Sequence, residues 1–262
     1  MLEEIIHLDG INVNYKTGGI GPCVLILHGW GGSSDSWQLI GEALVKNNYK
    51  VIIPDLPGFG KSDFPVAIWS VGDYLDFILK FIEELKSLEK ISEPLFLIGH
   101  SFGGRISIKF AAISPKKIKK VILCSAAGII AKRGIKIRTF NFFAKIGKSI
   151  FSFGCLVSLK ALLRKALYRV AGSGDYLRAN PQMKEVMKKV ISEDLTGFLP
   201  KINVPTLIIW GENDKVLSVK DGRLMQKRII GSKINIIENV GHAPNIESPE
   251  KLAKLILDWF SK

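Results

Sequence analysis

The sequence predicts an α/β fold with a mostly parallel central sheet, flanked by helices, and an inserted helical segment. Short runs of consecutive apolar residues alternate with helical patterns, and this alternation stops in one stretch of the chain and then resumes. Strands that are apolar throughout are typical of parallel sheets covered on both faces. The length of 262 residues and the hydrophobic content of 47% are sufficient for a large packed core.

The N-terminal stretch differs from the rest of the core. Residues 5–15 alternate loosely around Asp9-Gly10, which is a hairpin signal, so we expect two antiparallel strands at a sheet edge. Beyond this hairpin, strands and helices alternate. We expect strands at 23–27, 50–53, 94–98, 120–124, 204–210 and 233–237, and helices at 36–46, 69–88, 102–113, 220–229 and 248–260.

Residues 128–200 interrupt this rhythm with several helical patterns, glycine punctuation and no clear strand. We therefore predict a core made of 1–127 and 201–262 and a helical cap inserted at 128–200. The predicted cap contains fourteen Lys and Arg against four Asp and Glu, which is +10 of the chain's net charge of +13. Because these basic residues are interleaved with apolar ones, we expect no nucleic-acid partner. A solvated surface and weak association with anionic membranes both remain open.

The strongest catalytic signal is Gly99-His100-Ser101-Phe102-Gly103-Gly104, between a predicted strand and a predicted helix. A G-x-S-x-G turn in that context holds the serine in a strained bend at the carboxyl end of the strand. The first amides of the following helix point to the same spot. We predict that Ser101 is a nucleophile and that the amide of Phe102 donates to an oxyanion.

A serine nucleophile needs a base and an acid that orients the base. Of the four histidines, His242 follows the last predicted strand, whereas the other three belong to the edge hairpin or to other motifs. The acid should follow a strand between serine and histidine in the chain, and only Gly211-Glu212-Asn213-Asp214 supplies one. We predict His242 as the base and Asp214 as the acid, with Glu212 as the alternative acid.

The glycine-rich loop His28-Gly29-Trp30-Gly31-Gly32 predicts a second oxyanion donor, the amide of Trp30. Asp55 lies in the Pro- and Gly-rich loop at 54–62, where we expect it to brace the loop. The three cysteines are unpatterned and no phosphate-binding or dinucleotide motif is present, so we expect buried thiols, no metal and no cofactor.

Five motifs in order resemble the α/β-hydrolase superfamily, in the branch with a helical cap after the sixth strand. They are HGWGG at 28–32, PDLPGFGKS at 54–62, GHSFGG at 99–104, WGENDKV at 210–216 and GHAPNIESPE at 241–250. The resemblance spans nearly the whole chain except the cap and implies the α/β-hydrolase fold and a serine hydrolase. Epoxide hydrolases and haloalkane dehalogenases of this fold have an aspartate where Ser101 stands, so that branch is disfavoured.

The expected activity is that of a carboxylesterase acting on small-molecule esters with small to medium apolar acyl groups. Carbon-carbon hydrolases of aromatic ring-cleavage products share a serine triad and a cap and are the main alternative, and a noncatalytic ligand-binding module is a further one. The acidic start of the chain and the lack of about 18 consecutive apolar residues favour a cytoplasmic protein.

Overall fold

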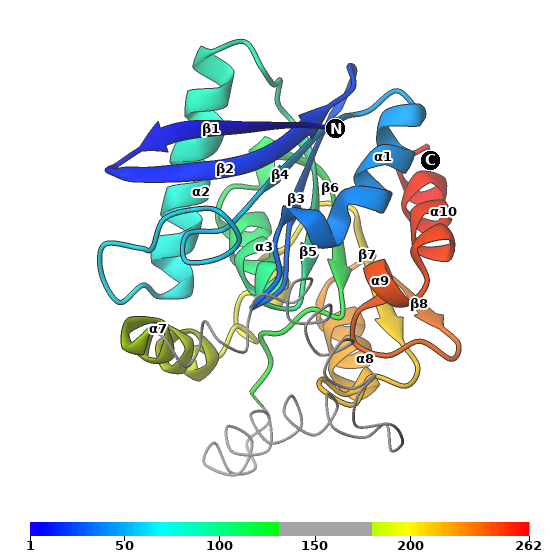
Figure 1. The fold of residues 1–262 in the computed structure, drawn as a ribbon. Coiled ribbons are helices and arrows are strands. Elements are labelled where there is room, and N and C mark those ends of the chain that lie inside the picture. The colour runs from blue at the N-terminus through cyan, green and yellow to red at the C-terminus, as the bar shows by residue number, and fades with distance from the viewer. Residues whose placement is uncertain (131–179, 262) are drawn as a thin grey trace, which may run out of the picture.

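The computed structural model describes residues 1–130 and 180–261, which form an eight-stranded sheet between two layers of helices (Figure 1). The sheet order is β1-β2-β4-β3-β5-β6-β7-β8. β1 and β2 form an antiparallel hairpin, β2 pairs antiparallel with β4, and all other neighbours are parallel. The strands are β1 (Leu2–Leu8), β2 (Ile11–Gly18), β3 (Cys23–Leu27), β4 (Lys50–Pro54), β5 (Leu95–His100), β6 (Ile118–Cys124), β7 (Thr206–Gly211) and β8 (Lys233–Ile237).

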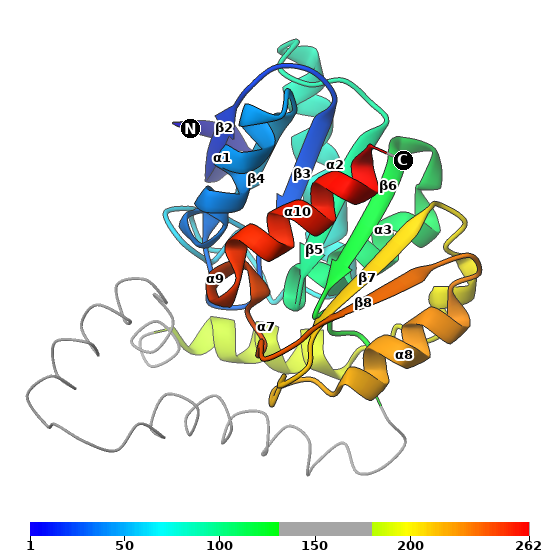
Figure 2. The ribbon, with the colours of Figure 1, turned by 90° about the vertical axis from the view of Figure 1, so that its right-hand side faces the viewer.

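Helices cover both faces of the sheet, as Figure 2 shows for α1 and α10 on the near face. The helices are α1 (Gln38–Lys46), α2 (Val71–Ser87), α3 (Phe102–Ile113), α7 (Pro181–Ser192), α8 (Val219–Arg228), α9 (Pro244–Glu247) and α10 (Pro249–Phe260). In β3, Val24 and Ile26 pack in the cluster that contains residues of α1 and α10, whereas Leu25 and Leu27 pack in the cluster of α2, α3 and α8. Every β3 residue is buried, which explains its continuous apolar sequence.

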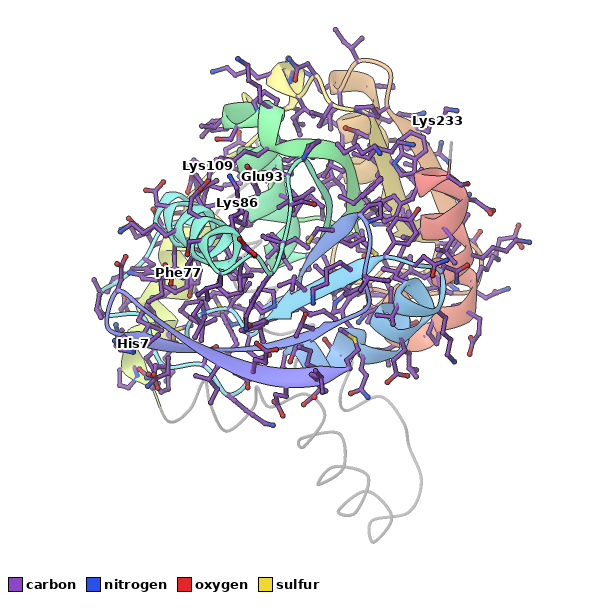
Figure 3. All side chains as sticks on the ribbon, turned by 90° about the horizontal axis from the view of Figure 1, so that it is seen from above. His7, Phe77, Lys86, Glu93, Lys109 and Lys233 are labelled. Carbon is purple, nitrogen blue, oxygen red and sulfur yellow. The ribbon has the colours of Figure 1, made fainter. Side chains whose placement is uncertain are left out.

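Most predicted elements agree with the structure to within a few residues. The Asp9-Gly10 signal forms the β1–β2 hairpin, and Figure 3 shows His7 of that hairpin at the periphery of the molecule. The predicted helix at 36–46 begins later, as α1, because a short 3-10 turn at Ser34–Trp37 precedes it. The helix predicted at 69–88 begins at Val71, where Ser70 and Asp73 form a capping box.

The predicted cap falls mostly on residues 131–179, outside the described part of the chain, so its extent stays a prediction. Within 180–200 the structure describes α7, whose buried face packs on the core through Met183 and Val186. The two described ends of the insertion meet, because the Leu195 amide donates to the Gly128 carbonyl at 2.8 Å.

Two described cysteines, Cys23 and Cys124, are buried free thiols, as expected, and Cys155 lies outside the described residues. Burial raises the pKa of the Cys23 thiol to about 12. Among the described helices, none combines the length and the apolar character needed to cross a bilayer.

The parallel strands place their carboxyl ends along one edge of the sheet. There β3 leads into the loop of His28, β5 into Ser101, β7 into the loop of Asp214, and β8 into the loop of His242. In open α/β sheets this edge is where ligands bind. Four predicted site segments, far apart in sequence, are thereby brought together.

Candidate active site

Ser101 sits on a sharp turn between β5 and α3, with φ +48° and ψ −105°. Its amide donates to the Cys124 carbonyl at 3.1 Å, and its own carbonyl accepts from the Ala127 amide at 3.0 Å, so β6 fixes the turn. The flanking glycines are required by close approach. A Cβ on Gly99 would overlap the Ser107 side chain, and a Cβ on Gly103 would overlap the Leu27 carbonyl oxygen. A strained, well-supported turn of this kind is typical of a nucleophile elbow.

His242 connects Ser101 to Asp214. Its Nε2 lies 3.0 Å from Ser101 Oγ, and its Nδ1 lies 2.8 Å from Asp214 Oδ2. A carboxylate only accepts hydrogen bonds, so in the neutral ring Nδ1 carries the hydrogen and Nε2 accepts from the serine hydroxyl. The Asp214 side chain is fully buried and that of His242 is 21% exposed. The arrangement can remove the serine proton and hold the histidine in one orientation.

Asp214 is fixed on its other side as well. Its Oδ1 accepts from the amides of Val216 and Leu217, both at 2.8 Å. The alternative acid, Glu212, instead accepts from the Asn239 amide at 3.3 Å and therefore braces the neighbouring loop. Of the two carboxylates that the sequence left as candidates, Asp214 is the one that contacts His242.

The two predicted oxyanion donors, Trp30 and Phe102, lie side by side. Their ring centroids are 5.2 Å apart, and each ring also contacts Phe59, at 4.8 Å from Trp30 and 6.0 Å from Phe102. The loop and the elbow are further joined by the Gly103 amide, which donates to the His28 carbonyl at 3.0 Å. Among the described residues, the amides of Trp30 and Phe102 donate no hydrogen bond, so both are available to a ligand.

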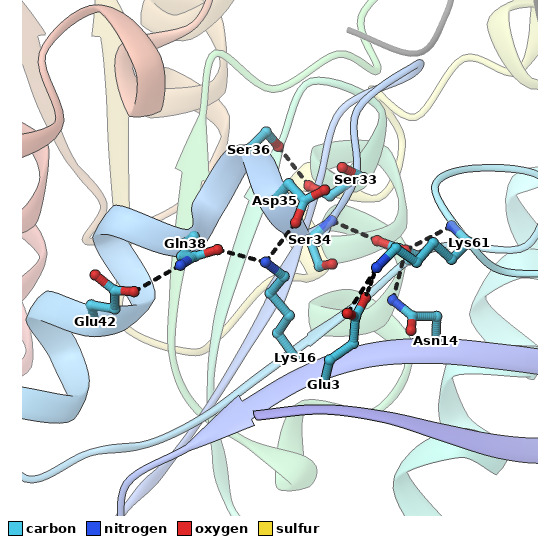
Figure 4. Close-up of polar contacts among 11 residues, drawn as sticks. Glu3, Asn14, Lys16, Ser33, Ser34, Asp35, Ser36, Gln38, Glu42 and Lys61 are labelled. Atoms are coloured by element: carbon cyan, nitrogen blue, oxygen red, sulfur yellow. Dashed lines mark hydrogen bonds and ion pairs between the residues drawn. The ribbon is translucent and has the colours of Figure 1, made fainter. Parts of the chain in front are cut away.

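Asp55 braces its own loop at 54–62, as the sequence predicted, and also fixes the chain just after the 28–32 loop. Its carboxylate is buried and accepts from the Ser34 amide at 2.6 Å, the Lys61 amide at 2.9 Å and Asn14 Nδ2 at 3.0 Å. Figure 4 shows these three donor residues together, with the ion pair of Lys61 and Glu3 beside them. Asp55 thus joins β2, the 3-10 turn at Ser34–Trp37 and the 54–62 loop.

His28 completes that support. Its Nδ1 lies 2.8 Å from the Gly29 carbonyl, to which it donates, and its Nε2 accepts from the Leu56 amide at 3.0 Å. Burial lowers the pKa of His28, and the nearby Asp55 opposes this in part. A neutral ring is what the pattern of one donor and one acceptor requires.

Two residues that hold the His242 loop were not predicted from the sequence. Glu247 accepts from the amides of Gly241 and Ala243, on either side of His242. His100 Nε2 lies 2.8 Å from the His242 carbonyl oxygen. The sequence carries a local signal for Glu247, because this acidic residue follows Pro244 in the first turn of the short helix α9, five positions after His242. The contact of His100 spans 142 positions and leaves no signal in a single sequence.

The chain is similar to known proteins over most of its length. A family model described as the alpha/beta hydrolase fold matches residues 22–249. Lipase 1 of Psychrobacter immobilis is 25% identical, over 96% of this chain and 78% of its own length. Monoacylglycerol lipase ABHD6 of Bos taurus is 28% identical, over 92% of this chain and 75% of its own length.

Among solved structures, a membrane phospholipase A described as a bacterial virulence factor superposes with a TM-score of 0.81. It is 26% identical, and the match covers 99% of this chain and 86% of that protein. The family match includes strands β3 to β8 and the strained Ser101, whereas the β1–β2 hairpin lies before its first residue. The chain therefore belongs to the alpha/beta hydrolase family and is a hydrolase.

Proposed function

We propose that the protein is a serine carboxylesterase in which Ser101 is the nucleophile, His242 the general base and Asp214 the orienting acid. One observation carries the proposal: His242 lies within hydrogen-bonding distance of both Ser101 Oγ, at 3.0 Å, and Asp214 Oδ2, at 2.8 Å. A nucleophile, a base and an orienting acid in contact are the requirement for activating a serine.

In the proposed reaction, Ser101 Oγ attacks the ester carbonyl carbon while His242 Nε2 takes the hydroxyl proton. The amides of Trp30 and Phe102 receive the negative charge on the carbonyl oxygen. His242 then gives its proton to the alcohol oxygen as the ester C–O bond breaks. The alcohol leaves, and the acyl group stays on Ser101 Oγ as the acyl-enzyme. A water molecule attacks next, again with His242 as base, and releases the acid and the free serine. Asp214 stays ionised and stabilises the imidazolium.

The proposed substrates are esters with small to medium apolar acyl groups. The aromatic cluster of Trp30, Phe59 and Phe102 lies next to the nucleophile, and apolar surface of this kind favours apolar ligands. Relatives named lipase and monoacylglycerol lipase support the same substrate class. Each added methylene of the acyl chain should contribute up to about 0.8 kcal/mol until the acyl pocket is filled.

Two measurements test this function together. The parent protein should be labelled by a fluorophosphonate and hydrolyse a series of p-nitrophenyl esters, with kcat/KM rising with acyl length. Ser101→Ala should lose labelling and turnover while it keeps the parent's circular dichroism spectrum, leaving only the roughly 10³- to 10⁴-fold enhancement over water that binding and the oxyanion donors supply. Labelling of Ser101→Ala equal to the parent would show that Ser101 is not the nucleophile. A flat acyl profile would contradict the substrate class.

The same assay separates the alternatives. Cleavage of an aromatic ring-cleavage product in preference to every ester would favour a carbon-carbon hydrolase. An unlabelled parent would favour a noncatalytic ligand-binding module.

We also propose that the basic region at 128–200 gives weak association with anionic membranes. Most of it lies outside the described residues, but Lys184, Lys188 and Lys189 of α7 are exposed. Sedimentation with anionic vesicles should decrease at high salt, and neutral vesicles should bind less. Equal binding to both vesicle types would show that the basic region is a solvated surface with no preference for anionic membranes.

A further inference from the structure

We propose that His100 is a positioning residue for the reaction: its imidazole donates a hydrogen bond to the backbone carbonyl of His242 and so sets the place of the base relative to Ser101. This inference rests on the proposed roles of Ser101 and His242. His100 is the residue before Ser101, and its hydrogen bond goes to the backbone of His242, whereas the proton moves between Ser101 Oγ and His242 Nε2.

The hydrogen bond has a defined direction. His100 Nε2 lies 2.8 Å from the carbonyl oxygen of His242, and a carbonyl oxygen only accepts, so Nε2 carries the hydrogen. The two residues come from the ends of different strands, β5 and β8. A single side chain thereby links the turn that carries the nucleophile to the loop that carries the base.

The imidazole is also held in place by packing. Its centroid lies 5.2 Å from that of His242 and 6.1 Å from that of the buried Trp37. Gly29 of the oxyanion loop approaches the other ring nitrogen, because a Cβ built there would lie 2.7 Å from His100 Nδ1. The imidazole therefore packs between the loop at 28–32 and the loop that carries His242, and it belongs to the turn that carries Ser101.

His100 can donate this hydrogen bond without disfavouring protonation of His242, because the His100 ring stays uncharged. Burial is the main reason that the pKa of His100 falls to about 3, with smaller contributions in the same direction from the nearby His242 and His28. The hydrogen bond to the His242 backbone and the charge of Asp214 oppose this pKa shift in part. His242 becomes an imidazolium during the reaction, and a second positive charge nearby would disfavour that state. A neutral N–H donor orients the loop and adds no such repulsion.

A role in packing alone makes a different prediction from a role in donating this hydrogen bond. Glutamine places an amide N–H where Nε2 stands in histidine, whereas asparagine is one methylene shorter and reaches only the position of Nδ1. His100→Gln therefore keeps the donor, and His100→Asn removes it. His7→Gln on the exposed edge hairpin is the matched control for the loss of one histidine (Figure 3).

The experiment measures kcat and KM for a p-nitrophenyl ester, and the rate of fluorophosphonate labelling, in all four proteins. We expect His100→Asn to lower kcat and the labelling rate about 10- to 100-fold with KM nearly unchanged, since a misplaced base costs the chemical step and not substrate binding. His100→Gln should stay within a few-fold of the parent, as should His7→Gln. The acid limb of the pH profile should be the same in His100→Gln as in the parent, because no charge is lost.

Two results would overturn the inference: equal activity of His100→Asn and His100→Gln, or a loss that falls on KM alone. If His100→Asn does not fold, Gly29→Ala replaces it. Its Cβ displaces the imidazole while the donor remains in the chain, and it should lower kcat by a similar factor; parental kcat in Gly29→Ala would contradict the inference. Ser101→Ala distinguishes failure of the proposed function from failure of the His100 role. Turnover by Ser101→Ala would refute the proposed function itself and not the positioning role alone.

Discussion

Glu247 Oε2 accepts a hydrogen bond from the Gly241 amide at 2.6 Å, immediately before His242 in the chain. Its other oxygen accepts from the Ala243 amide, immediately after His242, at 3.0 Å. One carboxylate therefore brackets the base through its two neighbours. Since the carboxylate is at the end of α9 and next to α10, the C-terminal helices fix the His242 loop to the body of the fold.

Replacing the Glu247 carboxylate should lower kcat for ester hydrolysis. In Glu247→Gln one oxygen becomes an NH2 donor and cannot accept from one of the two amides, so the His242 loop becomes less constrained. Because Glu247 is exposed and water can replace the lost bond, we expect a fall in kcat of about tenfold or less. Ester kinetics check this, with Glu250→Gln at an exposed position of α10 as the control. A larger loss in the control would show that the effect is nonspecific.

The two carboxylates after β7 should behave differently. Asp214→Asn removes the charge that orients His242 and stabilises its imidazolium, so kcat should fall about 10⁴-fold. Glu212→Gln alters only an exposed carboxylate that accepts from the Asn239 amide, and kcat should fall far less. The comparison needs only kcat at saturating ester. The reverse order of losses would assign the acid to Glu212.

Asp55→Asn should lower the free energy of unfolding, with only a minor effect on kcat for ester hydrolysis. The buried carboxylate accepts from three donors, and an asparagine directs its own NH2 at one or more of them. Leaving such a donor unsatisfied should lower the free energy of unfolding by about 1–3 kcal/mol, which urea denaturation would measure. Asp35→Asn is the control, since that side chain is 63% exposed and its pair with Lys16 is worth less than about 1 kcal/mol. Equal losses in the two variants would contradict the anchoring role of Asp55.

The buried histidines predict a stability that depends on pH. The pKa of His100 is about 3 in the folded chain against an ordinary value of 6.5, so between these values the unfolded state binds more protons. The His100 contribution is therefore fully present above pH 6.5 and is lost as the pH falls toward 3, with a slope of up to about 1.4 kcal/mol per pH unit. Burial also lowers the pKa of His28, so the two contributions have the same sign.

Urea denaturation at pH 7 and pH 5 checks this prediction, because that interval lies above the range in which carboxylates take up protons. The parent should lose free energy of unfolding between pH 7 and pH 5. In His100→Gln that loss should be smaller by about 2 kcal/mol, and in His7→Gln it should equal the parent's. An identical loss in the parent and in His100→Gln would show that His100 takes up its proton as readily in the folded chain as in the unfolded one.

The order of strands and helices can be read from the amino-acid sequence, because burial on both faces produces continuous apolar strands and helices produce their own periodicity. It also limited the candidates for each chemical role, since residues such as Ser101 and Trp30 lie in glycine-containing turns directly after predicted strands. These signals are local: each depends on residues within a few positions of one another.

Contacts between residues that are far apart in the sequence became known only from the three-dimensional structure. It placed Asp214 and not Glu212 against His242, although both follow the same strand, because the turn directs only one of the two carboxylates into the sheet edge. It also brought His100 to the carbonyl of a residue 142 positions away. Such contacts follow from the order and register of parallel strands, which set which loops meet at the carboxyl edge, and no local pattern in the chain encodes that meeting.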